Sequence, residues 1–296
     1  MIDNKNYLFT GVCTALITPF KNGKIDYSSL KKLIEFQISQ GVDALLVNGT
    51  TGENAVLDDK EVRELISFAI SEVGQRVPVV AGTGSNSTEK AIKLTQFAQE
   101  VGADAALVVT PYYNKATSEG LKRHYLSIAD KTDVPLILYN VPSRTGVNIP
   151  IDVYGELSKC ESIIGVKEAN SSIGHFAHLA MECREKVALY SGNDDLIVPT
   201  LSLGGSGVIS VLSNALPKEV GAICRSFFER RIKEASELQL KLLPLVDAIF
   251  SEVNPIPIKA LLSYLGFCEE EYRLPLCPMN DEKKKVLLTA FENFKF

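Results

Sequence analysis

Residues 78–109, PVVAGTGSNSTEKAIKLTQFAQEVGADAALVV, predict a parallel strand, a helix and a second parallel strand. The run Pro78–Ala81 is too short for a helix and too continuously apolar for a half-exposed strand, which is typical of a parallel strand covered on both faces. A helical pattern follows over Thr88–Val101, with Ser87 or Thr88 as the expected N-cap. Gly102 stands where a left-handed residue commonly ends a helix, and the next apolar run is Ala105–Val109.

The same alternation extends over the first two-thirds of the chain. Eight short apolar runs separated by amphipathic helical patterns indicate an α/β fold, either a closed parallel barrel or a doubly wound sheet. Because eight is the strand number of the barrel, we expect a (β/α)8 TIM barrel. The predicted strands are Val12–Ile17, Ala44–Val47, Pro78–Ala81, Ala105–Val109, Leu136–Tyr139, Ile163–Val166, Ala188–Ser191 and Gly207–Val211.

After the eighth predicted strand the chain shows only helical patterns, such as Val220–Arg230 and Lys233–Ile249. One of these helices would close the barrel, and the others would form a C-terminal helical extension outside it. We therefore predict a catalytic barrel over residues 1–225 and a helical segment over residues 226–296. No linker rich in serine, glycine or proline separates them, so the segment is expected to pack on the barrel and not to be independent.

Composition narrows the classes of partner and cofactor. The formal net charge of the 296 residues is −5 and no long basic run exists, which argues against nucleic acid or an anionic membrane as the main partner. There is no signal peptide pattern, and the six cysteines are scattered, as expected for a cytoplasmic protein. His175 and His178 lack acidic or cysteine partners nearby, so no metal is expected. No GxGxxG or Walker loop appears, so a nucleotide cofactor is not indicated.

In a barrel, functional residues lie where strands end, and three such residues suggest carbonyl chemistry. Lys167 ends an apolar run, where burial would favour the free amine that attacks a ketone to form an imine. Tyr139 ends the preceding strand and could transfer protons, while Arg144 offers a planar fork for a carboxylate. The alternatives are a solvated lysine at the barrel rim, an interior aromatic filler and a surface charge.

Six motifs occur in order along the chain. They are GTTGE (49–53), TPYYN (110–114), YNVPSRTG (139–146), GVKEA (165–169), GNDD (192–195) and GVISV (207–211). This order resembles the dihydrodipicolinate synthase / N-acetylneuraminate lyase superfamily, and within it the synthase family, over essentially the whole chain. The resemblance implies a class I Schiff-base lyase without metal or organic cofactor. The implied reaction condenses pyruvate with L-aspartate 4-semialdehyde to give 4-hydroxy-tetrahydrodipicolinate in lysine (diaminopimelate) biosynthesis.

The resemblance also implies roles for individual residues. Lys167 would form the Schiff base, and a proton relay would join Thr50, Tyr139 and Tyr113, the last reaching a neighbouring subunit across a tight dimer. Family members are homo-oligomers, either tight dimers or homotetramers built as dimers of dimers. The residues implied in substrate binding are Thr51 with the Gly49–Gly52 loop for the pyruvate carboxylate, Arg144 for the second carboxylate, Ile209 through its backbone, and Gly192.

Two other functions stay open at this level. N-acetylneuraminate lyases and 2-keto-3-deoxy-sugar-acid aldolases share the superfamily, but they generally have Ser-Thr where this chain has Thr50-Thr51, and they lack the arginine. Ala169 also matches the synthases. The acidic pair Asp194-Asp195 is ambiguous, because it could bind the hydroxyls of a sugar substrate. A non-catalytic keto-acid-binding protein is the remote alternative, although such a protein would be expected to have lost part of the lysine and relay set.

A regulatory site is doubtful. Asn86 and Tyr112 match the pattern of synthases that bind the end product lysine. However, Asp59 and Val62 stand where sensitive bacterial enzymes have histidines, and Lys90 replaces a glutamate that pairs with the effector's ammonium. A like charge should repel lysine, so we predict weak or absent feedback inhibition.

Overall fold

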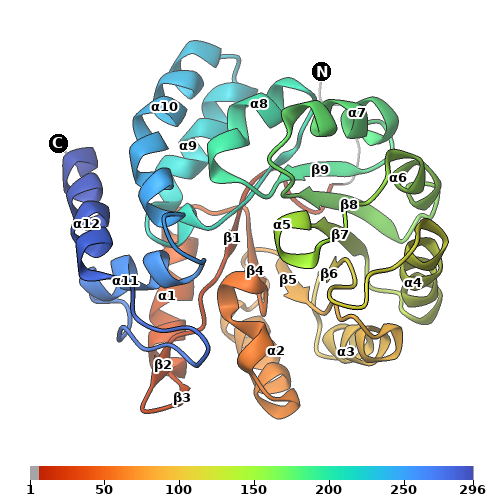
Figure 1. Cartoon of the computed structure of the whole chain (residues 1–296), viewed down its shortest axis with the longest axis horizontal. Helices are drawn as coiled ribbons and strands as arrows, with labels where there is room; N and C mark the ends of the chain where they lie inside the picture. Colours follow the sequence, from red (N-terminus) through yellow and green to blue (C-terminus); the bar gives the residue numbers. More distant parts are fainter. Residues whose placement is uncertain (1–6, 296) are drawn as a thin grey trace.

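The computed structural model describes residues 7–295 of the chain, and its centre is a closed barrel of eight parallel strands (Figure 1). Around the barrel the strands follow the order β1-β10-β9-β8-β7-β6-β5-β4. Each predicted strand is present, with its ends shifted by two residues at most, so the (β/α)8 prediction is confirmed. The strands are β1 (Gly11–Ala15), β4 (Ala44–Val47), β5 (Val79–Gly82), β6 (Ala105–Val109), β7 (Leu136–Asn140), β8 (Ile163–Glu168), β9 (Ala188–Ser191) and β10 (Gly207–Ser210).

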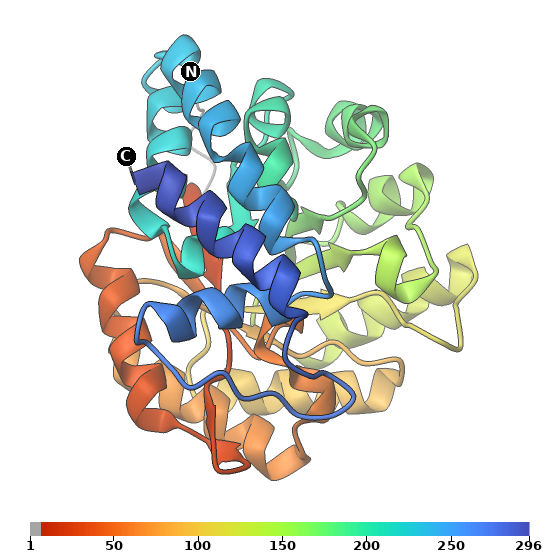
Figure 2. The ribbon, with the colours of Figure 1, turned by 60° about the vertical axis from the view of Figure 1, so that its left-hand side comes forward.

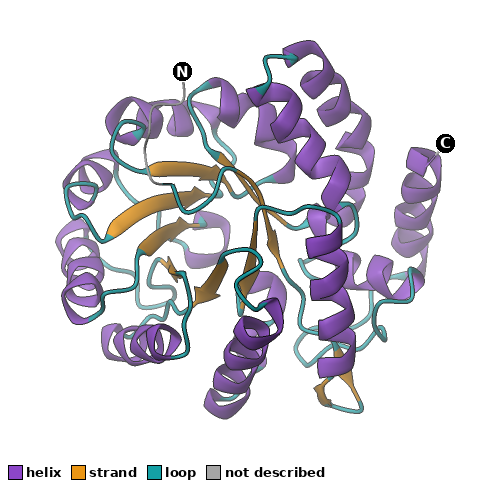
Figure 3. Ribbon diagram, turned by 180° about the vertical axis from the view of Figure 1, so that it is seen from behind, coloured by secondary structure: helices purple, strands orange, loops and turns teal. Residues whose placement is uncertain are grey.

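Helices surround the barrel on its outside (Figure 3). The caps expected for the helix that begins at Thr88 are present, because the Ser87 hydroxyl accepts a hydrogen bond from the Lys90 amide and Gly102 has a φ of 90°. The helices are α1 (Tyr27–Ser39), α2 (Asp59–Val73), α3 (Thr88–Glu100), α4 (Ser118–Lys131), α5 (Pro142–Thr145), α6 (Ile151–Leu157), α7 (Ile173–Cys183), α8 (Ile197–Ser202) and α9 (Pro217–Phe228).

Short elements occupy the connections and were not predicted. A hairpin of β2 (Phe20–Lys21) and β3 (Lys24–Ile25) follows the first barrel strand, and each of its strands is too short to show a periodic pattern. Four 3-10 turns lie after barrel strands or beside them. They are η1 (Thr50–Gly52), η2 (Asn54–Val56), η3 (Asp194–Leu196) and η4 (Leu212–Asn214).

Alternation along the strands divides the apolar core in two. In β1, Val12 belongs to the layer between barrel and helices, whereas its neighbour Cys13 belongs to the cluster inside the barrel. In β8, Val166 likewise lies in an outer cluster of apolar residues. Because side chains alternate along a strand, the residue after Val166 points to the barrel interior and the next one points outward. Because of this alternation, Lys167 points into the mouth of the barrel and Glu168 points to the outer face of the strand.

The C-terminal helices α10 (Ile232–Ile249), α11 (Ile256–Tyr264) and α12 (Asp281–Lys295) cover one side of the barrel (Figure 2). Helix α10 packs on α9 and α12 packs on α10, while α11 contacts η4 after the last strand. The predicted helical extension is thus present. The division between residues 225 and 226 stays a prediction, since α9 runs through that position, and residues 1–6 and 296 of the two predicted parts lie outside the described residues. Among the described helices, none is both long and apolar enough to cross a membrane.

Candidate active site

The ends of β7 and β8 bring the first two predicted site residues together. Tyr139 and Lys167 are opposite one another in the register of the two strands, and both side chains are buried. The Lys167 Nζ atom lies 4.5 Å from the centroid of the Tyr139 ring. The rim-lysine alternative is therefore wrong, because Lys167 is only 5% exposed. An amine and a phenol share one small space at the mouth of the barrel.

Behind this pair, Glu168 holds the two strand ends from the outer face. Its carboxylate accepts hydrogen bonds from Asn140 Nδ2 at 2.8 Å, from the Tyr154 hydroxyl at 2.9 Å and from the Asn170 amide at 2.7 Å. Burial and the nearby Glu168 carboxylate raise the pKa of Tyr154 well above its usual value, so this phenol stays a proton donor to the carboxylate. Glu168 was not among the predicted site residues, although a charged residue at the end of an apolar run is a visible signal in the sequence.

The GTTGE motif forms a tight turn after β4. Residues 50–52 make the 3-10 turn η1, and Glu53 ends it in the left-handed region with a φ of 55°. The amide of Glu53 donates to the Thr50 carbonyl at 3.1 Å. Thr51 is buried and its hydroxyl accepts a hydrogen bond from Asn254 Nδ2 at 3.0 Å. Thr50 is half-buried, and its side chain faces a cleft.

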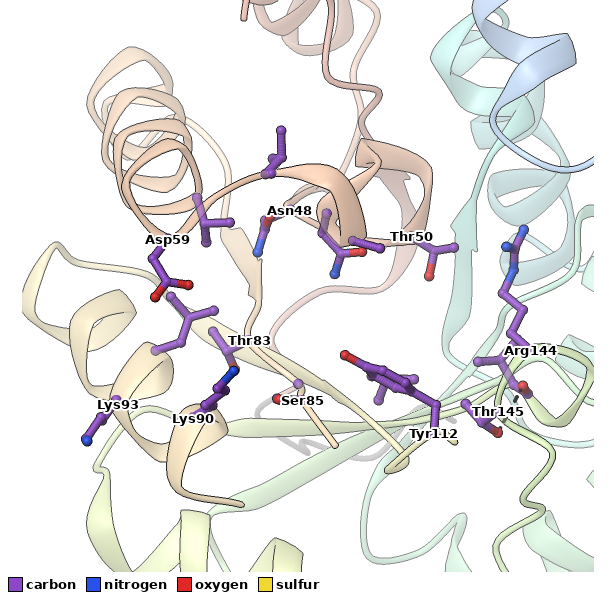
Figure 4. Close-up of a pocket in the computed structure, with 18 of the residues that line it drawn as sticks. Asn48, Thr50, Asp59, Thr83, Ser85, Lys90, Lys93, Tyr112, Arg144 and Thr145 are labelled. Carbon is purple, nitrogen blue, oxygen red and sulfur yellow. Dashed lines mark hydrogen bonds between the residues drawn. The ribbon is translucent and has the colours of Figure 1, made fainter. Parts of the chain in front are cut away.

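That cleft has a volume of about 420 Å³ and joins two groups of predicted residues (Figure 4). Thr50 and Arg144 line one side of it in Figure 4, and Asp59 and Lys90 line the other. The Arg144 Nη2 atom donates to the Asn254 carbonyl at 3.0 Å, and Arg144 is an exposed residue. A guanidinium at the open rim of the site could receive a carboxylate as it enters.

The third member of the predicted relay lies apart from the other two. Tyr113 follows β6 in a left-handed conformation with a φ of 69°, and 93% of its side chain is exposed. Within a single chain it is therefore not brought to Lys167 or Tyr139. A large aromatic side chain held out in solvent is unusual for a monomer and is what an element reaching another subunit would present.

The remaining predicted substrate-binding residues complete the barrel mouth. Ile209 is buried in the same interior cluster as Tyr139. Gly192 follows β9, and its amide donates to the Glu168 carbonyl at 2.7 Å. A Cβ atom at position 192 would lie 2.7 Å from the Cβ of Ala169, so only glycine allows this close approach of the two strand ends.

The two members of the acidic pair Asp194-Asp195 lie in different surroundings. Asp194 is fully buried, and its carboxylate accepts hydrogen bonds from the amides of Val211 and Leu212 at 3.0 and 2.9 Å. Burial raises the pKa of Asp194, and the two backbone amides counter this effect. Asp195 is exposed beside it. The carboxylate of Asp194 thus connects the loops after β9 and β10.

Four of the five residues named for regulation line the cleft: Asp59, Val62, Lys90 and Tyr112. Asn86 is not among the lining residues, and its carbonyl accepts a hydrogen bond from Asn114 Nδ2 at 2.9 Å. In the part of the chain that the structure describes, no group of three histidine, cysteine, aspartate or glutamate side chains could hold a metal ion.

The comparisons with known proteins agree with this arrangement. The model of the dihydrodipicolinate synthetase family matches residues 8–293. A 4-hydroxy-tetrahydrodipicolinate synthase from Alkaliphilus oremlandii is 47% identical over 281 residues, which are 95% of this chain and 97% of the relative. The solved dihydrodipicolinate synthase from Thermotoga maritima superposes with a TM-score of 0.96 at 41% identity, covering 98% of this chain and 99% of that one.

A second solved relative is the dihydrodipicolinate synthase from Acinetobacter baumannii, whose structure holds pyruvate. It superposes with a TM-score of 0.94 at 40% identity, covering 97% of this chain and 99% of its own. Family model, relatives and solved structures all span nearly the whole chain and confirm the resemblance seen in the sequence motifs. The chain belongs to the dihydrodipicolinate synthetase family.

Proposed function

We propose that this chain is a carbon–oxygen lyase that condenses pyruvate with L-aspartate 4-semialdehyde through an imine on Lys167. The product would be 4-hydroxy-tetrahydrodipicolinate, in lysine biosynthesis. The observation that carries the proposal is the buried Lys167 amine beside the Tyr139 ring at the C-terminal end of the barrel. The name shared by the curated relatives supports the same reaction.

The first step joins pyruvate to the enzyme. The free amine of Lys167 attacks the ketone carbon of pyruvate, and the resulting carbinolamine loses water to become a protonated imine. We assign to the Tyr139 hydroxyl, whose ring lies beside the amine, the delivery of the proton that leaves with the carbinolamine oxygen. The hydroxyl of Thr51 and the tight turn around it would hold the carboxylate.

The second step makes the carbon–carbon bond. The protonated imine withdraws electrons, so the methyl carbon of the bound pyruvate releases a proton and becomes an enamine. This carbon attacks the aldehyde of the second substrate, whose carboxylate we assign to Arg144. The amino group of the second substrate then attacks the imine carbon, closes the ring and releases the Lys167 amine. Each step moves a proton, which a chain of hydroxyl groups can do without holding a net charge.

We assign that chain to Thr50, Tyr139 and Tyr113, with Tyr113 supplied by a second copy of the protein. The exposure of Tyr113 supports this assignment, because 93% of its side chain is exposed in the single chain and is accessible to a partner. The working form would then be a dimer or a dimer of dimers. All six cysteines are unpaired, which fits a reducing cytoplasm as the place of reaction.

Two observations favour the synthase over a sugar-acid aldolase. A polyhydroxylated substrate needs several polar side chains in the site, and the buried Asp194 offers only its Oδ1 atom, because Oδ2 already accepts hydrogen bonds from two backbone amides. Arg144 at the rim instead suits a small substrate that carries a carboxylate. A binding protein without activity would have no use for the pairing of Lys167 with Tyr139, which is why we set that alternative aside.

Borohydride reduction in the presence of pyruvate tests the imine. Mass spectrometry should show one adduct per chain, equal in mass to pyruvic acid minus one oxygen, and peptide mapping should place it on Lys167. The Lys167→Arg variant keeps the positive charge and should give no adduct. Lys259, also buried, is an internal control for non-specific capture. Folded wild-type protein without an adduct would refute the proposal.

A coupled assay then identifies the second substrate. With pyruvate present, L-aspartate 4-semialdehyde should be consumed, and the cleavage of N-acetylneuraminate should remain at background. The opposite result would move the chain to the sugar-acid aldolases despite its family.

A further inference from the structure

The segment Asn254–Lys259 precedes and begins α11, yet it contacts the substrate-binding loops at the barrel mouth. We propose that Asn254 is a positioning residue for pyruvate, whose amide turns the Thr51 hydroxyl toward the pyruvate carboxylate. This inference rests on the proposed function, because it assumes that Thr51 binds that carboxylate.

The geometry of one hydrogen bond sets the direction of the Thr51 proton. Asn254 Nδ2 donates to Thr51 Oγ1 at 3.0 Å, and both side chains are more than nine-tenths buried. A hydroxyl has one proton and two acceptor positions. Since the amide fills an acceptor position, the proton must point elsewhere, and within residues 7–295 no other partner of this hydroxyl is present. The hydroxyl is thereby kept as a donor for an incoming anion.

The same residue also holds the second anion-binding group. The backbone carbonyl of Asn254 accepts a hydrogen bond from Arg144 Nη2 at 3.0 Å. Asn254 therefore forms a hydrogen bond with each of the two residues that we assign to the substrate carboxylates. In the sequence it lies more than 100 positions from Arg144 and 203 positions from Thr51. Fixing the two contacts relative to each other would fix the distance between the two substrates.

Asn254 keeps this position although one of its own atoms is unsatisfied. Its Oδ1 is buried and has no hydrogen-bond partner in the described part of the chain. A buried acceptor without a donor lowers stability, so an apolar residue would serve the fold better here. Its presence is explained if the amide is retained for its effect on Thr51.

A buried ion pair anchors the segment to the same loop. Lys259 Nζ lies 2.5 Å from Glu53 Oε1, and both side chains are completely buried. Glu53 immediately follows the turn that carries Thr51. The ammonium also lies 4.1 Å from the centroid of the Phe20 ring. Two attachments five residues apart thus hold the segment against the loop, so the amide of Asn254 has little freedom to turn away.

The test measures pyruvate binding with the Asn254→Ala and Asn254→Asp variants. The readouts are the pyruvate concentration that gives half-maximal borohydride adduct on Lys167, and KM and kcat for pyruvate. Loss of one hydrogen bond should raise the half-saturating pyruvate concentration about 3- to 10-fold in Asn254→Ala, with a smaller change in kcat. Asn254→Asp should raise it further, because a carboxylate would accept the Thr51 proton and repel pyruvate.

A double-mutant cycle separates positioning from general damage. If Asn254 acts through the hydroxyl, Asn254→Ala should have almost no further effect on pyruvate binding in a Thr51→Val background. Asn280→Ala is the matched control. It also removes side-chain hydrogen bonds, from the amides of Glu282 and Lys283 at the start of α12, but neither of these partners is a proposed substrate-binding residue. It should leave half-saturation unchanged, and thermal unfolding of all variants should show folded protein.

The outcomes are distinguishable. Wild-type protein that forms no adduct would overturn the proposed function itself. Wild-type protein that forms the adduct, with Asn254 variants of unchanged half-saturation, would overturn this inference alone. The inference would also be overturned if Asn254→Ala had the same effect with Thr51 or Val at position 51.

Discussion

Lys167 and Tyr139 stand opposite each other on neighbouring parallel strands, with the amine nitrogen 4.5 Å from the centre of the aromatic ring. The ring packs beside the amine, and the hydroxyl can transfer protons. Replacing Tyr139 by phenylalanine would keep the first contribution and remove the second. The Tyr139→Phe variant therefore separates the effect of the ring from that of the hydroxyl.

We expect Tyr139→Phe to lower kcat by about 10²- to 10⁴-fold, the usual range for loss of a proton-transfer group, with an unchanged fold. The coupled assay and the rate of adduct formation with borohydride measure this. Tyr190→Phe is a matched control, because Tyr190 lies opposite Lys167 on the other neighbouring strand and its hydroxyl donates to the Phe9 carbonyl. If both variants lost activity equally, the hydroxyl of Tyr139 would have no special role.

The backbone around this pair was predictable, and its supporting side chains were not. Apolar runs and their helical spacers are local patterns, which is why the eight strands could be located from the sequence. The hydrogen bond between Asn140 and Glu168 depends on the register of two strands, and no local pattern contains that register. Lys167 and Tyr139 could be singled out from their positions at predicted strand ends, and only the structure shows that the amine and the ring lie 4.5 Å apart.

Long-range contacts were missed for a related reason. Asn254 and Thr51 are separated by 203 residues, and their hydrogen bond depends on where α11 returns to the barrel. Helical patterns predicted that the C-terminal segment exists, but not which loop it contacts. In the sequence, Lys259 has the pattern of an ordinary charged residue on a helix surface. In the structure it is completely buried against Glu53.

Lys90 provides the prediction on regulation. It lines the cleft with Asp59, and an ammonium at this position should repel lysine (Figure 4). We expect half-inhibition of the wild-type enzyme only above about 1 mM lysine, which corresponds to a weak interaction. Lys90→Glu should lower that concentration by exchanging repulsion for attraction.

Inhibition curves with lysine at fixed substrate concentrations measure this effect. Lys60→Glu gives the same charge change on α2, outside the cleft, and should leave the curve unchanged. Strong inhibition of the wild-type enzyme below about 1 mM would show that the cleft tolerates a second ammonium beside Lys90.

The buried pair of Glu53 and Lys259 leads to a prediction on stability. Burial lowers the pKa of Lys259, and the Glu53 carboxylate opposes this effect, so the lysine depends on its partner to remain charged. Lys259→Met would leave a buried carboxylate unpaired, at a cost of about 3–5 kcal/mol in the free energy of unfolding. The double variant Glu53→Gln with Lys259→Met should recover a large part of that loss. Urea unfolding of the three proteins measures it, and equal losses in the single and double variants would contradict the ion-pair argument.

His124 makes the stability of the fold depend on pH. The side chain is 4% exposed, its Nδ1 atom lies 2.9 Å from the Thr88 hydroxyl, and its Nε2 atom has no partner among the described residues. Burial lowers the pKa of His124 from 6.5 to about 4, because the charged imidazolium is poorly solvated in the fold. As the pH falls below 6.5, His124 becomes protonated in the unfolded chain, whereas in the folded chain it stays neutral until about pH 4.

The contribution of His124 to the free energy of unfolding should therefore be constant above pH 6.5 and fall by up to about 3 kcal/mol as the pH approaches 4. Urea unfolding at about pH 7 and about pH 5 measures the slope. His124→Gln cannot be protonated, so the difference between its stability and that of the wild type should change across this window. His178→Gln removes an exposed histidine and should keep the wild-type slope. A parallel pH dependence in the wild type and His124→Gln would mean that other groups cause the loss of stability in acid.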